Sequence, residues 1–259
     1  MGIINVTPDS FYDGGKTVDL KQILTQAETM LKEGATFLDI GGYSSRPGAD
    51  EVSETEELER VLPAIERILK EFPEAPISVD TFRSKVAREA VAIGAALVND
   101  ISGGSMDTVM ISEASKLKVP YILMHMRGTP QTMTSLTNYD NITKDVLKYF
   151  SEKISLARAA GINDIVADPG FGFAKTREQN FELLNNLELF KQLDIPYLVG
   201  LSRKSMIYKT LETTVDEALN GTTALHSVAL LKGASILRVH DVTEAVECIK
   251  LLQHLNNSD

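Results

Sequence analysis

The sequence predicts a single α/β domain, a closed (β/α)8 barrel of parallel strands and surrounding helices that spans residues 1–259. Eight short apolar runs are spread from one end of the chain to the other, and each closes on a polar or charged residue. The segments between the runs are long enough for helices. A chain of 259 residues with 43% hydrophobic content also suits this fold, for which about 250 residues is typical.

The apolar runs are the expected strands, and the residue that closes each run is expected at the carboxyl end of its strand. In chain order the runs with their closing residues are 3–4 with Asn5, 37–38 with Asp39, 77–79 with Asp80, 96–98 with Asn99, 121–124 with His125, 165–167 with Asp168, 197–201 with Ser202, and 236–237 with Arg238 and His240. Carboxyl ends of barrel strands converge on one face, where the chemistry of such folds takes place. The closing residues therefore predict one active site. Only residues 2–6 are available for the first strand, and the sequence leaves open whether others precede them.

Helices are predicted where apolar residues recur at three- and four-residue spacing. In residues 53–72 this pattern follows Ser53, a good N-cap, and the early acids Glu54 and Glu56. Similar faces occur in 20–31, 146–160, 181–193, 218–231 and 242–255. A glycine precedes four of the strands, as expected where a helix stops and the chain turns: Gly34, Gly94, Gly161 and Gly233.

Composition excludes several classes of protein. The net charge of −10 disfavours nucleic-acid binding, which depends on clustered Lys and Arg. No apolar stretch approaches the roughly 18 residues of a membrane span, and no basic segment followed by a hydrophobic one opens the chain, so a cytoplasmic protein without membrane contact is expected. The lone Cys248 has apolar neighbours and is expected to be a buried thiol that cannot form a metal framework.

Basic residues at the strand ends indicate an anionic ligand. Five of them fall at or just after predicted strand ends: Arg46, Arg203, Lys204, Arg238 and His240. The loops at 5–15 and 41–48 combine glycines, hydroxyls, a proline and charge, a composition suited to wrapping an anion. The first runs to about ten residues, whereas loops of this kind usually take two to six. We expect both loops to close over a ligand.

Asp80, Asn99 and Asp168 end three different strands and are expected to face the same mouth. Two carboxylates and a carboxamide match a flat, donor-rich ring such as a pterin or a guanine. Lys204 is expected opposite Asp168, pairing with it when the site is empty. Among the histidines, His240 is the functional candidate, His125 suits either a site-lining or a core position, and the helical His226 and His254 are expected to be structural or exposed.

These motifs resemble, in order and over essentially the whole chain, those of the dihydropteroate synthase family. The matching segments are 1–11, 41–48, 78–83, 99–104, 124–126, 168–173, 202–205 and 238–241. The resemblance implies a cytosolic enzyme of folate biosynthesis, usually a homodimer. It would join (7,8-dihydropterin-6-yl)methyl diphosphate to 4-aminobenzoate, giving 7,8-dihydropteroate and diphosphate.

The same resemblance implies roles for individual residues. Those implied for the pterin are Asp80, Asn99, Asp168 and Lys204, with Met124 and Phe173 as walls of the slot. Those implied for the diphosphate are Ser45, Arg238 and His240, with Asn5 for Mg²⁺. Those implied for the 4-aminobenzoate pocket are Phe11, Arg46, Pro47 and Ser202. The chain departs from the family at Ser45, where Thr is usual, and at Tyr12, where Ser is common.

The implied chemistry separates a cationic pterin methylene from an anionic diphosphate, so the site must stabilise both charges. The catalytic candidates are Asp168, Lys204, Asp80, Arg238 and His240. Because the dihydropterin can delocalise a cation and no nucleophile is evident, dissociation before amine attack is the working hypothesis. Two alternatives remain open: a pterin-binding methyltransferase that serves a corrinoid partner, which would not need Arg238 and His240, and a noncatalytic pterin-binding barrel.

Overall fold

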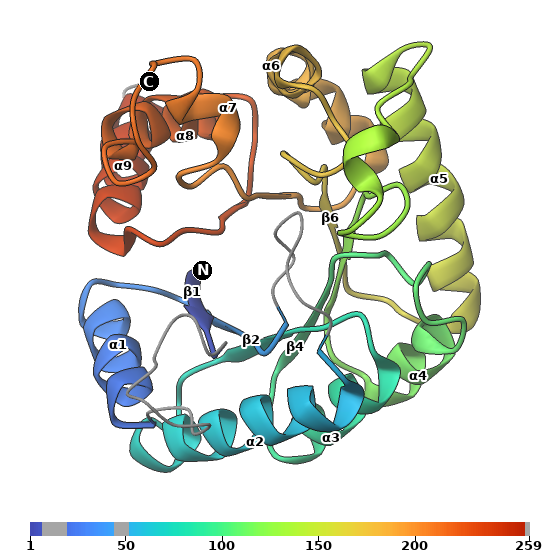
Figure 1. The fold of residues 1–259 in the computed structure, drawn as a ribbon, viewed down its shortest axis with the longest axis vertical. Coiled ribbons are helices and arrows are strands. Elements are labelled where there is room, and N and C mark those ends of the chain that lie inside the picture. The colour runs from blue at the N-terminus through green and yellow to red at the C-terminus, as the bar shows by residue number, and fades with distance from the viewer. Residues whose placement is uncertain (7–19, 44–51, 257–259) are drawn as a thin grey trace.

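The computed structural model describes residues 1–6, 20–43 and 52–256 and confirms the predicted barrel. In Figure 1 the helices surround the strands, and the colour passes in order around the ring from the blue α1 to the red α9. Each strand is followed by a crossover to a parallel neighbour, which places all carboxyl ends on one face.

The elements alternate along the chain. The strands are β1 Gly2–Asn5, β2 Leu38–Gly41, β3 Ile77–Asp80, β4 Leu97–Asp100, β5 Tyr121–Met124, β6 Ile165–Asp168, β7 Leu198–Val199 and β8 Ile236–Leu237. The α-helices are α1 Leu20–Lys32, α2 Glu54–Glu71, α3 Ser84–Ala92, α4 Met110–Leu117, α5 Ile142–Ala160, α6 Arg177–Asn185, α7 Ser205–Tyr208, α8 Leu219–Leu231 and α9 Val242–Asn256. Short 3-10 helices occupy η2 Met133–Ser135 and η3 Leu187–Leu193.

The barrel consists of a six-stranded sheet, β1 to β6 in chain order, and a β7–β8 pair. Single bridges close it, Ala167 to Tyr197 between β6 and β7, and Gly2 to Val239 between β8 and β1. At these two seams Ala167 N–H donates to the Pro196 carbonyl at 3.0 Å, and Ile3 N–H donates to Val239 at 2.9 Å. The β8–β1 seam has two further bonds, from the Val239 N–H to the Met1 carbonyl and from the Met1 ammonium to the Leu237 carbonyl, both at 2.9 Å.

Side chains alternate between the inside of the barrel and the helix layer, as the two-residue period of a strand requires. Leu97, Ile122, Val166 and Leu198 form a separate apolar cluster from four different strands, packed against Met1 and Ile236. Two residues further along β4, β5 and β6 the same face carries Asn99, Met124 and Asp168. The apolar cluster therefore forms a floor beneath a polar mouth.

Most predicted helices are confirmed with their signals. Ser53 accepts the Glu56 N–H at 3.2 Å and starts α2. The four glycines predicted at helix ends all have φ between 97° and 113°, a conformation that disfavours side chains.

Several element boundaries differ from the sequence prediction, and two of these differences bear on the site. The predicted helix 181–193 is divided into α6 and η3, because a capping box between Thr176 and Gln179 starts α6 at Arg177 and the helix ends at Asn186. Strand β2 continues past Asp39 to Gly41, so Asp39 lies inside the strand and not at its end. With Leu38 and Ile40 in the core shared with the helices, the alternating Asp39 faces the interior of the barrel.

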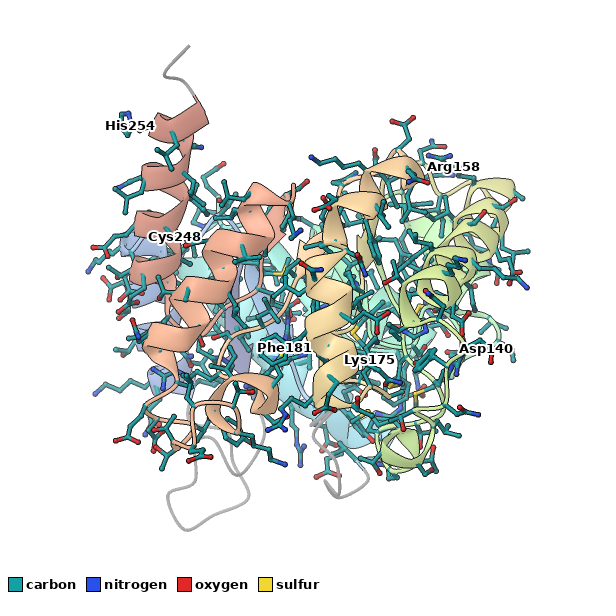
Figure 2. All side chains as sticks on the ribbon, turned by 90° about the horizontal axis from the view of Figure 1, so that it is seen from above. Asp140, Arg158, Lys175, Phe181, Cys248 and His254 are labelled. Atoms are coloured by element: carbon teal, nitrogen blue, oxygen red, sulfur yellow. The ribbon has the colours of Figure 1, made fainter. Side chains whose placement is uncertain are left out.

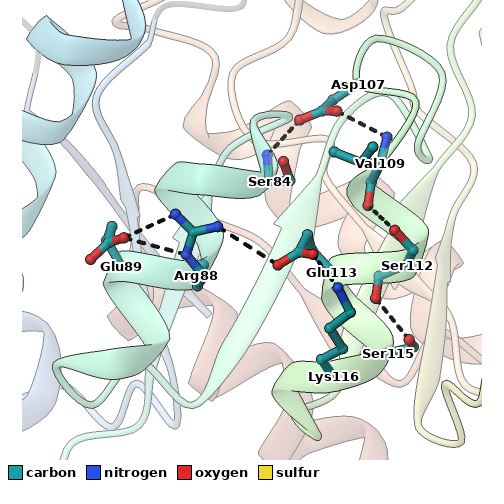
Figure 3. Close-up of polar contacts among 9 residues, drawn as sticks. All are labelled: Ser84, Arg88, Glu89, Asp107, Val109, Ser112, Glu113, Ser115 and Lys116. Carbon is teal, nitrogen blue, oxygen red and sulfur yellow. Dashed lines mark hydrogen bonds and ion pairs between the residues drawn. The ribbon is translucent and has the colours of Figure 1, made fainter.

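Helices α3 and α4 show how neighbouring units of the ring are joined. Asp107, just before α4, accepts the Ser84 N–H at the start of α3 at 2.8 Å and the Val109 N–H at 3.0 Å (Figure 3). Arg88 on α3 also reaches Glu113 on α4 at 3.8 Å. The two bonds to Asp107 satisfy backbone donors that a helix start leaves unpaired, and the ion pair adds a side-chain link between the helices.

No helix in the described ranges is both long and apolar enough to cross a membrane. Cys248 is buried in α9, as expected, and its sulfur lies 3.1 Å from the Ser227 hydroxyl of α8.

Candidate active site

An arginine in the mouth is held by two carboxylates, one from β2 and one from β3. Arg238, just after β8, donates from Nε to Asp39 at 2.6 Å and from Nη2 to Asp80 at 2.7 Å. Asp39 is fully buried and Asp80 largely so. The guanidinium matches two carboxylates with directed N–H groups, a geometry that a lysine cannot reproduce.

Asp39 also fixes the orientation of Asn99. The Asn99 side-chain amide donates to Asp39 Oδ2 at 3.1 Å, which leaves the Asn99 carbonyl oxygen to accept from a ligand. The second oxygen of Asp39, Oδ1, is buried and has no hydrogen-bond partner among the described residues. A buried carboxylate that lacks a full set of partners is costly unless its charge is paired, so Asp39 depends on Arg238.

Burial and the neighbouring charges act in opposite directions on Asp80 and on Arg238. It raises the pKa of Asp80 to about 7, while the adjacent Arg238 acts in the opposite direction. For Arg238 burial opposes the charged form, but Asp39 and Asp80 outweigh it and raise the pKa above the ordinary value of arginine. The guanidinium is therefore charged at every working pH.

Asp168 and Lys204 form the second half of the mouth, but they are not hydrogen-bonded to each other. Asp168 accepts the Gly170 N–H at 2.8 Å, and Lys204 donates from Nζ to the Phe171 carbonyl. Lys204 Nζ also lies 4.5 Å from the centre of the Phe173 ring. The predicted direct pairing of Lys204 with Asp168 is thus not found as a hydrogen bond or ion pair, because Lys204 Nζ donates to the Phe171 carbonyl of the β6–α6 loop.

The charges of these two residues still interact. Burial lowers the pKa of Lys204 to about 8, and Asp168 acts in the opposite direction. Burial likewise raises the pKa of Asp168, and Lys204 is the largest influence that opposes it. The charges of Asp168 and Lys204 therefore influence each other although no hydrogen bond joins the two side chains.

Ser202 and His240 lie together at the ends of β7 and β8. The Ser202 hydroxyl is 3.0 Å from His240 Nδ1 and accepts the His240 N–H at 3.2 Å. Arg203, at a positive φ of 54°, makes a two-pronged pair with Asp241 at 2.8 and 2.9 Å. The two adjacent strand ends are thereby tied to one another.

The apolar wall of the mouth is a second small cluster above the strand ends. It contains Phe82, Ile101, Met124, Met126, Met133 and Ala174, with Tyr43, Met106 and Phe173 packed against it. Both predicted wall residues, Met124 and Phe173, belong to it. A flat ring would meet this apolar surface on its face and the acids at its edge.

The remaining predicted residues divide into two groups. Asn5 is at the carboxyl end of β1, which is the neighbour of β8 across the second seam, and so shares that side of the mouth with His240. Phe11, Ser45, Arg46 and Pro47 fall in residues 7–19 and 44–51, outside the described residues, as does Tyr12.

Two groups around the mouth were missed as site residues by the sequence reasoning. Asp39 had been treated as a strand end, although its alternation with Leu38 and Ile40 could have placed it in the interior. Lys175 follows the Asp168 segment and gave no signal beyond its proximity in sequence; its Nζ lies 3.0 Å from His125 Nδ1. His125, left open between site and core, is buried and packs edge-on against Tyr149 at 4.8 Å between ring centres.

The described residues contain no group of three His, Cys, Asp or Glu side chains arranged to hold a metal ion. A cavity of about 480 Å³ lies between the ends of α1 and α2, lined by Leu31, Phe72 and Pro76 among others. It is at the amino-terminal side of the strands, away from the charged mouth.

A family model described as pterin binding enzyme matches residues 1–240. The chain is 47% identical to a dihydropteroate synthase of Synechocystis sp., covering 98% of this chain and 89% of that protein. It is 44% identical to the dihydropteroate synthase of Escherichia coli, with 98% and 90% covered.

Solved structures agree. A Yersinia pestis dihydropteroate synthase in a sulfonamide drug complex superposes with a TM-score of 0.93 at 42% identity, covering 99% of this chain and 94% of that one. A dihydropteroate synthase from Xanthomonas albilineans in complex with 7,8-dihydropteroate gives a TM-score of 0.89 at 37% identity, with 100% and 93% covered.

Replacing Asp39 with alanine should lower the free energy of unfolding by about 3 kcal/mol, because it leaves the guanidinium of Arg238 with one carboxylate in a buried setting. Urea denaturation at pH 7.5 measures the change. Glu28→Ala is the matched control, since it removes an exposed carboxylate paired with Lys32 at 2.6 Å and should cost less than about 1 kcal/mol. Equal losses in the two variants would contradict the assigned importance of Asp39.

Proposed function

Because the chain belongs to the pterin-binding enzyme family and, within it, to the dihydropteroate synthases, we propose that the polar mouth of its barrel is the active site for that reaction. The chain is accordingly a transferase of folate biosynthesis, which condenses (7,8-dihydropterin-6-yl)methyl diphosphate with 4-aminobenzoate to 7,8-dihydropteroate and diphosphate. The convergence of Asp80, Asn99, Asp168 and Lys204 with Arg238 at one end of the barrel is the observation that carries the assignment of residues.

Asp168 and Asn99 are proposed to bind the amino-pyrimidinone edge of the pterin. A carboxylate can accept from a ring N–H and an exocyclic amine, and the Asn99 carbonyl is left to accept by the commitment of its amide to Asp39. Lys204 would donate to the ring carbonyl or nitrogen, exchanging the Phe171 carbonyl for the ligand. Met124 and Phe173 would pack on the faces of the ring.

Asp80 and Arg238 link the pterin to the diphosphate. In the structure Arg238 Nη2 is occupied by Asp80 and Nε by Asp39. If the pterin takes Asp80 as its acceptor, Arg238 keeps Asp39 as counter-ion and has N–H groups to offer the leaving diphosphate. Ser45 and His240 are proposed to complete the anion site, and Phe11, Arg46, Pro47 and Ser202 to shape the 4-aminobenzoate pocket.

Asn5 is proposed as the protein ligand of Mg²⁺. The oxygen donor of Asn5 suits this hard cation, which binds few protein groups and keeps several waters or phosphate oxygens. Bound there, Mg²⁺ would neutralise charge on the diphosphate oxygens.

The charges of the mouth are proposed to favour dissociation of the diphosphate before the amine attacks. As the C–O bond between the pterin methylene and the diphosphate breaks, positive charge develops on the pterin beside Asp80 and Asp168. Negative charge develops on the leaving group beside Arg238 and His240. Preorganised groups of this kind stabilise a transition state without having to reorganise during the reaction.

We further propose that the 259 residues act as one domain, as a homodimer and in the cytoplasm. Large apolar side chains on the two packed helices α8 and α9 support self-association: Leu231, Leu251 and Leu255 are 60 to 69% exposed. Sedimentation velocity at micromolar concentration tests this, and a single monomer boundary would contradict it.

Diphosphate release from the dihydropterin diphosphate, with Mg²⁺ and with or without 4-aminobenzoate, tests the function directly. Dihydropteroate should form in proportion to diphosphate when both substrates are present. Release of diphosphate without 4-aminobenzoate would support the dissociative order. Tight pterin binding with no product would argue for a noncatalytic barrel.

Asp168→Asn and Lys204→Met should each reduce kcat/KM by roughly 30- to 1,000-fold, the effect of losing about 2 to 4 kcal/mol of transition-state stabilisation. Steady-state assays measure this, with Lys148→Met as control because that lysine is on the outer surface of α5 and 79% exposed. Near-normal activity in either site variant would refute its assignment.

The affinity for unphosphorylated pterin should be highest between about pH 7 and 8. Below that range Asp80, with its pKa raised to about 7 by burial, takes up a proton and loses its capacity as a double acceptor. Above it Lys204, with its pKa lowered to about 8, loses its positive charge. Calorimetric titration from pH 5.5 to 9.5 should show both limbs.

Asp80→Asn serves as the control for this profile, since an amide cannot titrate. It should bind more weakly and lose the low-pH limb, with Asp39, Asp168 and Arg238 still in place around it. A limb that persists unchanged in the variant would show that another group, or the ligand, titrates there.

A further inference from the structure

Lys175 is a buried cation that the proposed reaction does not use. It ends the loop between β6 and α6, directly before the N-cap Thr176, and is 8% exposed. In Figure 2 it is labelled beside the lower part of α6. Burial lowers its pKa well below the usual value, so an ammonium at this place needs a full set of partners.

The partners of Lys175 connect its own loop to the neighbouring strand end. Nζ donates to the Gly170 carbonyl at 2.9 Å and to the Phe173 carbonyl at 3.0 Å, and lies 3.0 Å from His125 Nδ1. Burial, followed by the charge of Lys175, keeps the pKa of His125 well below its usual value. The ring is therefore neutral, and in the tautomer with Nδ1 as acceptor the three donors of the ammonium meet three acceptors.

The loop to which Lys175 donates, residues 169–174, carries groups of the proposed pterin slot. The Gly170 N–H donates to Asp168, and the Phe171 carbonyl accepts from Lys204. The ammonium of Lys204 also lies over the Phe173 ring. The orientation of Lys204 in the empty site thus depends on the shape of residues 170–173. The hydrogen bonds of Lys175 go to this loop and to His125, and none goes to Lys204 or Asp168.

The backbone at Gly170 shows how closely this loop is pressed onto β5. Gly170 has φ of +67°, and a Cβ added there would lie 2.1 Å from the His125 carbonyl oxygen. The far side of the loop is held independently, by Asn180 on the Gly172 N–H at 2.7 Å and by the Tyr139 hydroxyl on the Ala174 carbonyl at 2.9 Å. Lys175 holds the side that faces His125.

We propose that Lys175 is a positioning residue of the pterin slot, which fixes the loop 169–174 against His125 and thereby sets the place of Phe173 and Lys204. The inference rests on the proposed assignment of that slot to the pterin. It assigns Lys175 no contact with either substrate. Its removal should therefore weaken the pterin and leave the 4-aminobenzoate interaction nearly intact.

Lys175→Met in the full chain is the principal test, because methionine fills similar space but leaves two carbonyls and His125 without donors. The Kd for unphosphorylated pterin should rise at least tenfold by calorimetry, and the KM for the dihydropterin diphosphate should rise with it. The KM for 4-aminobenzoate should stay within about twofold. Lys175→Gln, which keeps two donors, should give a smaller loss and supplies the measurement if the methionine variant does not fold.

Lys153→Met is the matched control. That lysine also donates from a helix to a loop carbonyl near the strand ends, Gly103 at 2.9 Å, and to the Ser105 hydroxyl at 3.1 Å, but on the β4–α4 loop. It should leave the pterin Kd within about twofold of the unsubstituted chain. A general sensitivity of the barrel to loss of a loop-binding lysine would make the two variants equal and overturn the proposal.

A double-variant cycle separates positioning from simple stabilisation. If Lys175 acts through Phe173, Lys175→Met should weaken pterin binding much less in a Phe173→Ala background than in the unsubstituted chain. Fully additive losses, or folded Lys175 variants with an unchanged Kd, would overturn the inference. An unsubstituted chain that binds no pterin would instead refute the proposed function itself.

Discussion

The pairing of Arg238 with Asp39 and Asp80 is the interaction on which the mouth of the barrel depends. It connects the last strand to the second and third across the interior, at distances of 2.6 and 2.7 Å. Three buried charges would be unfavourable singly, and each is acceptable because the others are present. The pairing also affects Asn99, because the hydrogen bond to Asp39 fixes the orientation of its side-chain amide. One guanidinium therefore organises donors and acceptors from four strands before any ligand is bound.

The interior of the barrel has an apolar layer that contributes to stability and, nearer the carboxyl ends of the strands, a polar layer suited to binding and catalysis. The floor of Leu97, Ile122, Val166 and Leu198 is apolar and joins four strands without polar groups. The layer above it carries the acids and the amide, because the same strand faces continue by two residues. Changing a floor residue would disturb packing, whereas changing the upper layer alters charge and recognition. Loops such as 169–174 then adjust the upper layer without rebuilding the barrel.

The sequence predicted what depends on local pattern and missed what depends on the closure of the fold. Apolar runs, glycines at helix ends and Ser53 as a cap were sufficient for the barrel and for the approximate positions of its strands and several helices. The strand-end rule brought Asp80, Asn99, Asp168 and Arg238 together correctly. It could not show that Lys204 prefers the Phe171 carbonyl to Asp168, since that choice depends on loop geometry. Lys175 was missed because its three partners come together only when β5 and β6 are paired.

The two seams of the barrel also bear on how the protein would lose activity when it begins to unfold. The β7–β8 pair is joined to the six-stranded sheet by single bridges at Ala167 and Gly2, and across the mouth by the pairs of Arg238 with Asp39 and Asp80. Ser202, Lys204, Arg238 and His240 all belong to the docked side, while Asp80, Asn99 and Asp168 stay with the main sheet. Loss of the Arg238 pairs would leave these two halves of the mouth joined mainly through the seams. Inactivation should then precede the loss of helical structure, as a partial opening with most of the barrel still folded.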